Sequence, residues 1–501
     1  MRAATALLVA LLAVTPLAPV QAQLPTLGEG GDMTTAAERK LGERIARELY
    51  RDPDYIDDPI LIDYVQGIWQ PLLAAAKLRG ELNTELDERF AWEILMGKDR
   101  TINAFALPGG YLGLHLGLIG VVANRDELAS VLAHELSHVT QRHISRLMTQ
   151  SSRMTPIMIG AMVLGALAAS KSPDAASALI MGGQGAAIQG QLNFSRDMER
   201  EADRIGYGVM TQAGFDPLGF VTMFDKLQQA SRLNDNGSFP YLRSHPLTTE
   251  RLADMQARQA LLTRPPTVPA DVVHNMMAAR ARVLSGPGVD QLRAWAGEAH
   301  SLAANAPADA RSAAVLYAGV LADSRLRDVA QARVLLERLK TVVGQQPAAA
   351  RQVGLLAAEI EWAAEDLPRT AAALDALDPK LAGRTELLMR AQLRIRQGQP
   401  AEAMQKMQAR VALDPRDATA WQLLATAYNA QGQTLRAIRA EAEQQVARLD
   451  YSGALDRFKA AQNFVRSSRG GTSPVDHIEA SIIDTRTRQV ESLVREQALE
   501  R

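Results

Sequence analysis

An internal repeat in the C-terminal half of the chain constrains the fold more than any other feature. The tripeptide Gln-Gly-Gln at 397–399 recurs at 431–433, 34 residues later, and Ala403 recurs as Ala437 at the same spacing. An apolar stripe with helical spacing precedes the second tripeptide: Trp421, Leu424, Ala425 and Tyr428. A repeated pair of helices cannot bury its apolar face alone, so such pairs stack on one another and leave a concave groove.

This period and this order of Trp, Leu, small residue and Tyr resemble tetratricopeptide repeats. Pro347, Pro379 and Pro415 fall near the expected ends of repeats. A generic helical bundle with a chance 34-residue echo is the alternative. We therefore expect an all-α, tetratricopeptide-like solenoid over residues 271–501, with a groove suited to binding a protein.

The rest of the chain divides by composition. The 501 residues are enough for two or three domains. The first 22 residues carry a short apolar run and end in Val-Gln-Ala, which predicts a signal peptide cleaved after Ala22 and export of the mature chain, either to the periplasm or out of the cell. A membrane anchor needs about 20 apolar residues, more than the run at 6–13 offers. Residues 23–264 form a first domain, and the proline-rich segment 265–270 is a linker.

Charge and cysteine content restrict the function. The chain has 55 Lys and Arg against 56 Asp and Glu, so it lacks the basic excess of a nucleic-acid binder, and we expect no nucleic-acid partner. It has no cysteine, so any metal site must use His, Asp and Glu.

The chemistry of the first domain centres on the motif His134-Glu135-Leu136-Ser137-His138. The apolar pattern predicts a helix from Asn124 to about Met148, with Asn124 and Glu127 forming a capping box. Histidines four apart lie one turn apart on the same face and can bind one Zn²⁺, and Glu135 beside them could take a proton from water. Two helical histidines are, alternatively, often only packed or solvated.

A catalytic zinc needs a third protein ligand and an open position. Glu199 and Asp203 also lie one helical turn apart, a spacing that suits one ligand and one carboxylate that holds an imidazole N–H. A solvated acidic helix face is the alternative. Together these motifs resemble the zinc metalloendopeptidases of the HtpX and CAAX-prenyl-protease family. The resemblance implies one Zn²⁺ per chain, Glu199 as third ligand, Asp203 as the supporting carboxylate, and Glu201 pointing elsewhere.

Two further segments match that family. The run at 101–110 resembles its Asn-Ala-Phe-Ala-x-Pro-Gly-Gly segment, and we read it as an exposed edge strand that pairs with an extended peptide, or else as an ordinary hairpin. The residues expected to bind substrate are Asn103, Ala104, Phe105 and Ala106. His245, in Ser-His-Pro ahead of Arg251, could stabilise an oxyanion, fill the open position of the metal, or lie on the surface.

The remaining features stay ambiguous. His115 and His143 match no ligand position, and we expect them to be structural or solvated. Residues 154–170 and 175–195 carry no charge, and prolines and glycines interrupt the first of these runs. We expect 154–195 to form a hydrophobic hairpin or lid over the site that could touch a membrane or an outer-membrane partner, with a plain buried hairpin as the alternative.

The combined expectation is a mainly α chain: an α+β zincin-type metalloprotease domain with a small edge sheet, followed by the repeat solenoid. This order resembles the periplasmic group of beta-barrel assembly-enhancing proteases. That resemblance implies cleavage of misassembled envelope polypeptides and a chaperone-like role with outer-membrane beta-barrel proteins and their assembly machinery, bound through the repeats. Two rivals remain: a scaffold or chaperone with a silent metal site, and a metal-dependent hydrolase of another bond.

Overall fold

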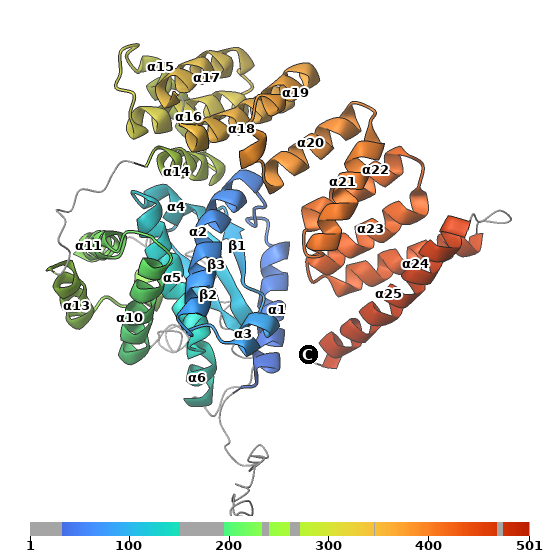
Figure 1. Ribbon diagram of the computed structural model, residues 1–501, viewed down its shortest axis with the longest axis horizontal. Helices are drawn as coiled ribbons and strands as arrows, with labels where there is room; N and C mark the ends of the chain where they lie inside the picture. Colours follow the sequence, from blue (N-terminus) through green and yellow to red (C-terminus); the bar gives the residue numbers. More distant parts are fainter. Residues whose placement is uncertain are drawn as a thin grey trace, which may run out of the picture.

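The computed structural model describes residues 33–150, 195–232, 240–260, 271–344, 346–467 and 474–499. The predicted signal peptide at 1–22, the linker at 265–270 and all of the predicted hairpin except Ser195 lie outside these residues. The fold class agrees with the prediction, because a helical part with one small sheet is followed by a long array of helices (Figure 1).

The N-terminal part surrounds a three-stranded sheet with helices. Its elements are α1 (Thr35–Arg51), α2 (Pro59–Leu78), α3 (Thr84–Arg89), β1 (Glu93–Gly97), β2 (Ala104–Leu107), the 3-10 turn η1 (Pro108–Gly110), β3 (Tyr111–His115), α4 (Leu116–Val121), α5 (Arg125–Thr140), α6 (His143–Gln150), α10 (Arg196–Gln212), α11 (Leu218–Arg232), α12 (Pro240–Ser244) and α13 (Thr249–Ala260).

The sheet has the order β1-β3-β2, with β1 parallel and β2 antiparallel to β3. Strand β2 is therefore an edge strand, as predicted. The expectation that it is exposed is wrong, because Ala104, Ala106 and Leu107 are buried where α5 packs against the strand. What remains open to pairing is the backbone of one edge, not the side chains.

The predicted helix around the His-Glu-Leu-Ser-His motif is interrupted. Asn124 caps α5 by accepting hydrogen bonds from the backbone N–H groups of Asp126 and Glu127. The Glu127 carboxylate reaches Ala123 N–H instead of Asn124 N–H, so the cap is not the predicted box. After Thr140 the chain leaves the helix, Arg142 adopts φ 52°, and α6 starts at the next residue. The single predicted helix is thus two helices with a left-handed residue between them.

The C-terminal part consists of helices joined by short turns. Its elements are α14 (Val272–Leu284), α15 (Val289–Ser301), α16 (Ala310–Arg325), α17 (Val329–Val343), α18 (Pro347–Ala363), α19 (Leu367–Asp375), the 3-10 turn η2 (Pro379–Leu381), α20 (Arg384–Arg396), α21 (Pro400–Leu413), α22 (Ala418–Ala430), α23 (Thr434–Ala447), α24 (Tyr451–Ser467) and α25 (Pro474–Leu499).

The two copies of Gln-Gly-Gln form the same turn. Gly398 between α20 and α21 has φ 74°, and Gly432 between α22 and α23 has φ 68°. In each copy the N–H of the last glutamine donates to a carbonyl five residues earlier, that of Arg394 or of Tyr428. Glycine adopts this left-handed conformation without steric penalty, which explains why it stands at both helix ends. The 34-residue repeat in the sequence is therefore a repeat of structure.

The two parts share their hydrophobic interior. One core cluster joins α2, α4 and α5 to α14, α16 and α18, and α4 packs directly against α14. A second cluster contains Leu41 and Ile45 of α1 together with Tyr111 of β3, Leu435 of α23 and Phe458 of α24, and α1 lies between the sheet and the last helices (Figure 1). Packing of this kind fixes the repeats relative to the sheet.

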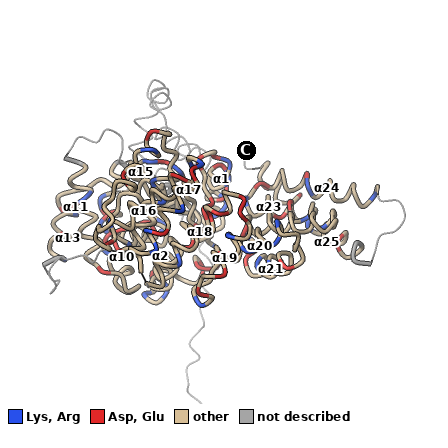
Figure 2. Tube along the Cα trace, turned by 90° about the horizontal axis from the view of Figure 1, so that it is seen from above, with Lys and Arg blue, Asp and Glu red and all other residues tan. Residues whose placement is uncertain are grey.

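Charges are mixed along the described helices. Figure 2 shows Lys and Arg interspersed with Asp and Glu, and it shows α24 and α25 projecting at one end of the molecule. Across the part of the chain that the structure describes, we find no helix with the length and apolar character needed to cross a membrane.

Candidate metal centre and catalytic site

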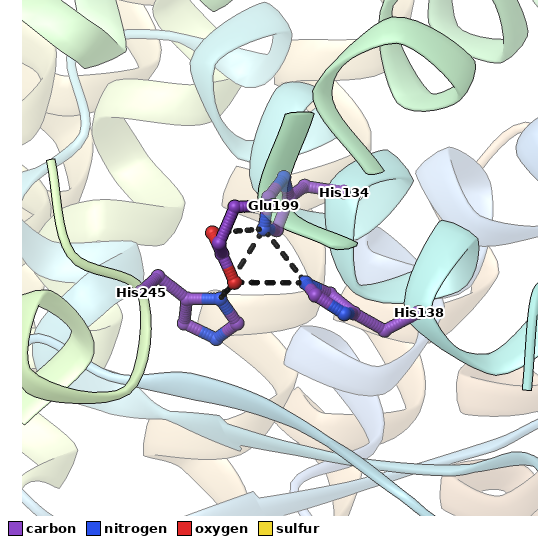
Figure 3. A group of neighbouring side chains, drawn as sticks. All are labelled: His134, His138, Glu199 and His245. Atoms are coloured by element: carbon purple, nitrogen blue, oxygen red, sulfur yellow. Dashed lines mark hydrogen bonds and ion pairs between the residues drawn. The ribbon is translucent and has the colours of Figure 1, made fainter. Parts of the chain in front are cut away.

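The candidate site lies where helices α5 and α10 pack against each other. Gly206 of α10 allows this close approach, because a Cβ atom there would lie 3.0 Å from the carbonyl oxygen of Ala133. The packing brings Glu199 in the first turn of α10 next to His134 and His138 of α5. His245, just after α12, completes a group of four buried side chains that point toward one another (Figure 3).

The donor atoms of these residues are close together. Nε2 of His134 lies 3.0 Å from Nε2 of His138, and the two Glu199 oxygens lie 3.5 Å from His134 Nε2 and 3.4 Å from His138 Nε2. His245 Nδ1 is 3.2 Å from His134 Nε2 and 3.0 Å from Glu199 Oε1. One ligand atom from each residue lies within 4.8 Å of all the others.

These residues fit a zinc ion. Zinc prefers imidazole nitrogen and carboxylate oxygen in tetrahedral geometry at about 2.0–2.1 Å, which separates its ligand atoms by roughly 3.3 Å. Five contacts between donor atoms of the cluster measure 3.0 to 3.5 Å, and one ligand atom from each residue lies within 4.8 Å of the other three. The size and the chemistry of the cluster therefore suit one tetrahedral divalent cation.

The electrostatics of the cluster favour a positive charge. Burial alone would lower the pKa of His134, but hydrogen bonds to Asp203 and Glu199 outweigh it and raise the pKa to about 10. Burial and the neighbouring His134 hold the pKa of His138 well below its usual range. Burial opposes ionisation of Glu199, yet His245 and His134 hold its pKa well below normal. An ionised carboxylate beside a neutral imidazole is a good ligand pair for a cation.

Asp203 contacts the ring of His134 from behind. Its Oδ1 lies 2.9 Å from Nδ1 of His134, on the opposite side of the ring from the cluster. Arg251 donates two hydrogen bonds to the same carboxylate, of 2.6 and 2.9 Å, and a third of 2.9 Å to the carbonyl of Pro246. Arg251 therefore ties Asp203 to the turn that carries His245.

A contact between His143 and His138 was not predicted from the sequence. His143 is fully buried, and its Nδ1 lies 2.9 Å from Nδ1 of His138. Its Nε2 lies 3.0 Å from Glu201, which points away from the four-residue cluster, as expected. A residue five positions after His138 would point to another side of a continuous helix, so only the break at Arg142 brings it back. No local pattern signals that break.

The edge strand meets Glu135, which lies between the histidines in the sequence. The backbone N–H of Ala106 donates a 2.8 Å hydrogen bond to Glu135 Oε2, and Glu135 Oε1 lies 3.3 Å from His245 Nε2. Burial raises the pKa of Glu135 above its usual value, although His245 and His134 partly offset this.

The remaining residues that we expected to bind substrate lie on or next to β2, and all except Phe105 are buried. Asn103 and Ala104 are buried, whereas Phe105 is half-buried and packs edge-on against His115. His115 is buried as well, with Nδ1 2.8 Å from the Thr101 hydroxyl, and it takes no part in the four-residue cluster. The solvated alternative for His115 and His143 is therefore wrong, and the roles of the other residues stay predictions.

Comparison with known families defines the class of the two parts. Residues 65–259 match the model of peptidase family M48, and residues 384–427 match a tetratricopeptide repeat model. The chain thus carries an M48 peptidase domain followed by tetratricopeptide repeats.

Several curated relatives match the chain. It is 36% identical over 261 residues to a Vibrio cholerae protein provisionally named a beta-barrel assembly-enhancing protease, covering 51% of the chain and 52% of the relative. It is 32% identical over 293 residues to the beta-barrel assembly-enhancing protease of Escherichia coli, covering 57% and 58%. A mitochondrial metalloendopeptidase of Arabidopsis thaliana is 30% identical over 164 residues, covering 33% and 31%. These matches span little more than half the length of the bacterial relatives.

Proposed function

We propose that the chain is a zinc-dependent endopeptidase, with His134, His138 and Glu199 as metal ligands. The observation that carries the proposal is the convergence of their donor atoms at 3.0–3.5 Å beside a buried glutamate and an edge strand. Had Glu199 lain far from the two histidines, only a helical adaptor protein would remain.

The proposed chemistry divides between the ion and the chain. Zinc, when bound, supplies a Lewis acid that polarises the scissile carbonyl and lowers the pKa of a water molecule to about 7. Glu135 takes the proton from the attacking water and delivers it to the leaving amine. Burial supports this role, because a carboxylate with a raised pKa is a better base near neutral pH.

The substrate is proposed to be a polypeptide in extended form that pairs with β2. In the antiparallel register, Asn103 accepts from His115 N–H on the β3 side, so the backbone groups of Ala104 and Ala106 face away from β3. The N–H of Ala106 donates to Glu135 there, so a substrate strand that pairs at this position displaces that hydrogen bond. Main-chain pairing of this kind holds a strand without requiring a particular side-chain sequence. A small amide substrate has no extended backbone that could pair with such an edge, so the edge favours a polypeptide substrate.

His245 has two candidate roles. Its Nδ1 lies among the ligand atoms, which favours a fourth ligand that leaves no position for water until the side chain moves. If the side chain swings away from the cluster, it could instead stabilise the oxyanion of the tetrahedral intermediate. The two roles predict opposite effects of His245→Ala: faster cleavage for a fourth ligand and slower cleavage for an oxyanion stabiliser.

The relatives suggest where and on what the enzyme acts. Because bacterial relatives are named beta-barrel assembly-enhancing proteases, we propose a periplasmic enzyme that cleaves misassembled or unfolded envelope proteins and assists assembly of outer-membrane beta-barrel proteins. The concave side of the repeats is the proposed binding surface for these proteins and their assembly machinery. A scaffold or chaperone with a silent metal site remains the second candidate, favoured by His245 Nδ1 within the cluster.

The test measures zinc content and cleavage of casein by the full chain. We expect one zinc per wild-type chain, zinc without cleavage in Glu135→Gln, and loss of both zinc and cleavage in Glu199→Ala. His245→Ala is included because, if His245 blocks the metal as a fourth ligand in the wild type, its removal should increase the rate of casein cleavage. Equal zinc in wild type and Glu199→Ala would remove Glu199 from the ligand set, and full cellular function of Glu135→Gln would favour the scaffold.

A further inference from the structure

His143 is the one histidine next to the cluster to which the proposed mechanism gives no task. Its side chain is fully buried and lies between a proposed ligand and a carboxylate, with its Nδ1 2.9 Å from His138 and its Nε2 3.0 Å from Glu201. The same Glu201 oxygen accepts a 2.9 Å hydrogen bond from Arg146. These contacts form one continuous path from the cluster to Arg146.

The backbone is arranged to bring His143 to this position. Arg142 is held in the left-handed region at φ 52°, and its Nε donates a 2.9 Å hydrogen bond to Glu38 of α1. On an unbroken helix, five residues correspond to about 140° of rotation, so position 143 would face away from His138. A left-handed residue other than glycine is unfavourable and persists where its surroundings enforce it.

The hydrogen bonds along this path can run in only one direction when His138 binds a metal. Nε2 of His138 faces the cluster and must be unprotonated to act as a ligand, so the neutral ring carries its proton on Nδ1. That proton is then donated to Nδ1 of His143. His143 in turn carries its own proton on Nε2 and donates it to Glu201, a strong acceptor. Each ring thus fixes the tautomer of the next.

The two helical histidines are supported by parallel arrangements of different length. His134 is backed directly by Asp203 and then Arg251, both almost completely buried. His138 is backed by His143, then Glu201 and then Arg146, and the Glu201 side chain is 29% exposed. The second arrangement therefore reaches the surface through an additional imidazole.

We propose that His143, held by Glu201, is a positioning residue that fixes the orientation and the proton of His138 and thereby the affinity of the site for zinc. The inference rests on the proposed function, because it assumes that His138 is a ligand. Partners behind a metal-bound histidine typically change metal affinity by 10–100-fold when they are removed. The structure assigns this role to an imidazole instead of the usual carboxylate or carbonyl.

The experiment measures the zinc dissociation constant of the full chain by chelator competition, together with thermal stability. We expect His143→Ala to bind zinc about 10–100-fold more weakly than wild type. His143→Asn should recover most of that affinity, because its amide oxygen can replace Nδ1 as acceptor from His138. Glu201→Gln should weaken binding by less than His143→Ala, because the amide still accepts a hydrogen bond.

The matched control is His274→Ala. His274 is equally buried and also uses both ring nitrogens, with Nδ1 2.6 Å from the Tyr64 hydroxyl and Nε2 2.8 Å from the Val122 carbonyl. It lies outside the metal cluster, so the variant should lose thermal stability and keep its zinc affinity.

Each outcome decides the proposal. Zinc affinity of His143→Ala within twofold of wild type overturns it, and so does an equal loss in His274→Ala, which would mark a general effect of destabilisation. Failure of His143→Asn to recover affinity overturns the assigned hydrogen-bond direction. A wild type that binds no zinc overturns both this inference and the proposed function. A wild type that binds zinc and cleaves casein, together with a zinc affinity of His143→Ala that is unchanged, overturns this inference alone.

Discussion

The backbone N–H of Ala106 donates a hydrogen bond to the carboxylate of Glu135 across 2.8 Å. This contact joins the free edge of the sheet to the helix that carries the paired histidines. A polypeptide that pairs with β2 would therefore run directly past the proposed base and the metal ligands. The proposed substrate-binding edge and the proposed base are thus in direct contact.

Glu135→Gln should abolish cleavage and leave the metal site intact. The amide keeps an oxygen that can accept from Ala106 N–H but cannot take a proton from water, so the rate should fall by about 10²–10⁴-fold. Casein cleavage and zinc content of the same preparation check the prediction. A variant that retains more than a tenth of wild-type activity would exclude Glu135 as the general base.

Removal of zinc should destabilise the protein. The cluster buries Glu199 close to His134, and a cation that binds only the folded state adds stability, by about 2.7 kcal/mol at a free concentration 100 times its dissociation constant. Thermal unfolding with and without a chelator measures this contribution. Glu199→Ala is the control, because its unfolding temperature should no longer respond to the chelator; an unresponsive wild type would argue against a resident ion.

The sequence was sufficient to predict which candidate side chains share a helix face. His134 and His138, like Glu199 and Asp203, are pairs one helical turn apart, and the helix period alone brings each pair to one face. The Gln-Gly-Gln turns were predictable for the same reason, since glycine at a fixed period marks the same helix end.

The parts that could not be predicted depend on contacts distant in sequence. The position of His143 follows from a left-handed conformation at Arg142, and arginine gives no signal for it. The shared core of α4 and α14 unites segments on both sides of the predicted linker, although composition separates them. Burial of β2 depends on the packing of α5 against it, whereas its sequence led us to expect an exposed edge strand.

Arg280 is predicted to hold the peptidase domain and the repeats together. Its side chain is buried in α14 and donates hydrogen bonds of 2.9 and 2.6 Å to Asp58, which caps the N-terminus of α2. It donates another of 2.6 Å to Glu359 of α18. Arg280→Met would leave both carboxylates without this partner. We expect the free energy of unfolding to fall by about 3 kcal/mol, measured by urea denaturation.

The control for Arg280 is Arg293→Met. Arg293 pairs with Asp290 on the surface, where both side chains are mostly exposed, so this change should have no measurable effect on stability. An equal free energy of unfolding for the two variants would show that the buried contacts of Arg280 do not stabilise the packing of the peptidase domain against the repeats.

Asp417 should make the stability of the repeats depend on acid pH. Its side chain is fully buried at the start of α22, where it accepts hydrogen bonds from Arg384, from Arg410 and from the N–H of Ala420. Burial alone would raise its pKa, but Arg384 and Arg410 outweigh it and hold the pKa below the usual range. The ionised form is thus favoured by folding, and its contribution is complete above the unfolded pKa of about 3.9 and disappears as the pH falls through the folded pKa.

Asp417→Asn tests this dependence, since asparagine also caps helices but carries no charge. At pH 7 the variant should be less stable than wild type by about 3 kcal/mol in urea denaturation, because two arginines lose a buried partner. Below about pH 4 the difference should shrink, since protonated Asp417 resembles asparagine. Asp375→Asn, which alters an exposed partner of Arg390, should show little difference at any pH. A difference for Asp417→Asn that stayed constant from pH 7 to pH 3 would mean that the carboxylate does not titrate in this range, and that its charge does not govern the acid response.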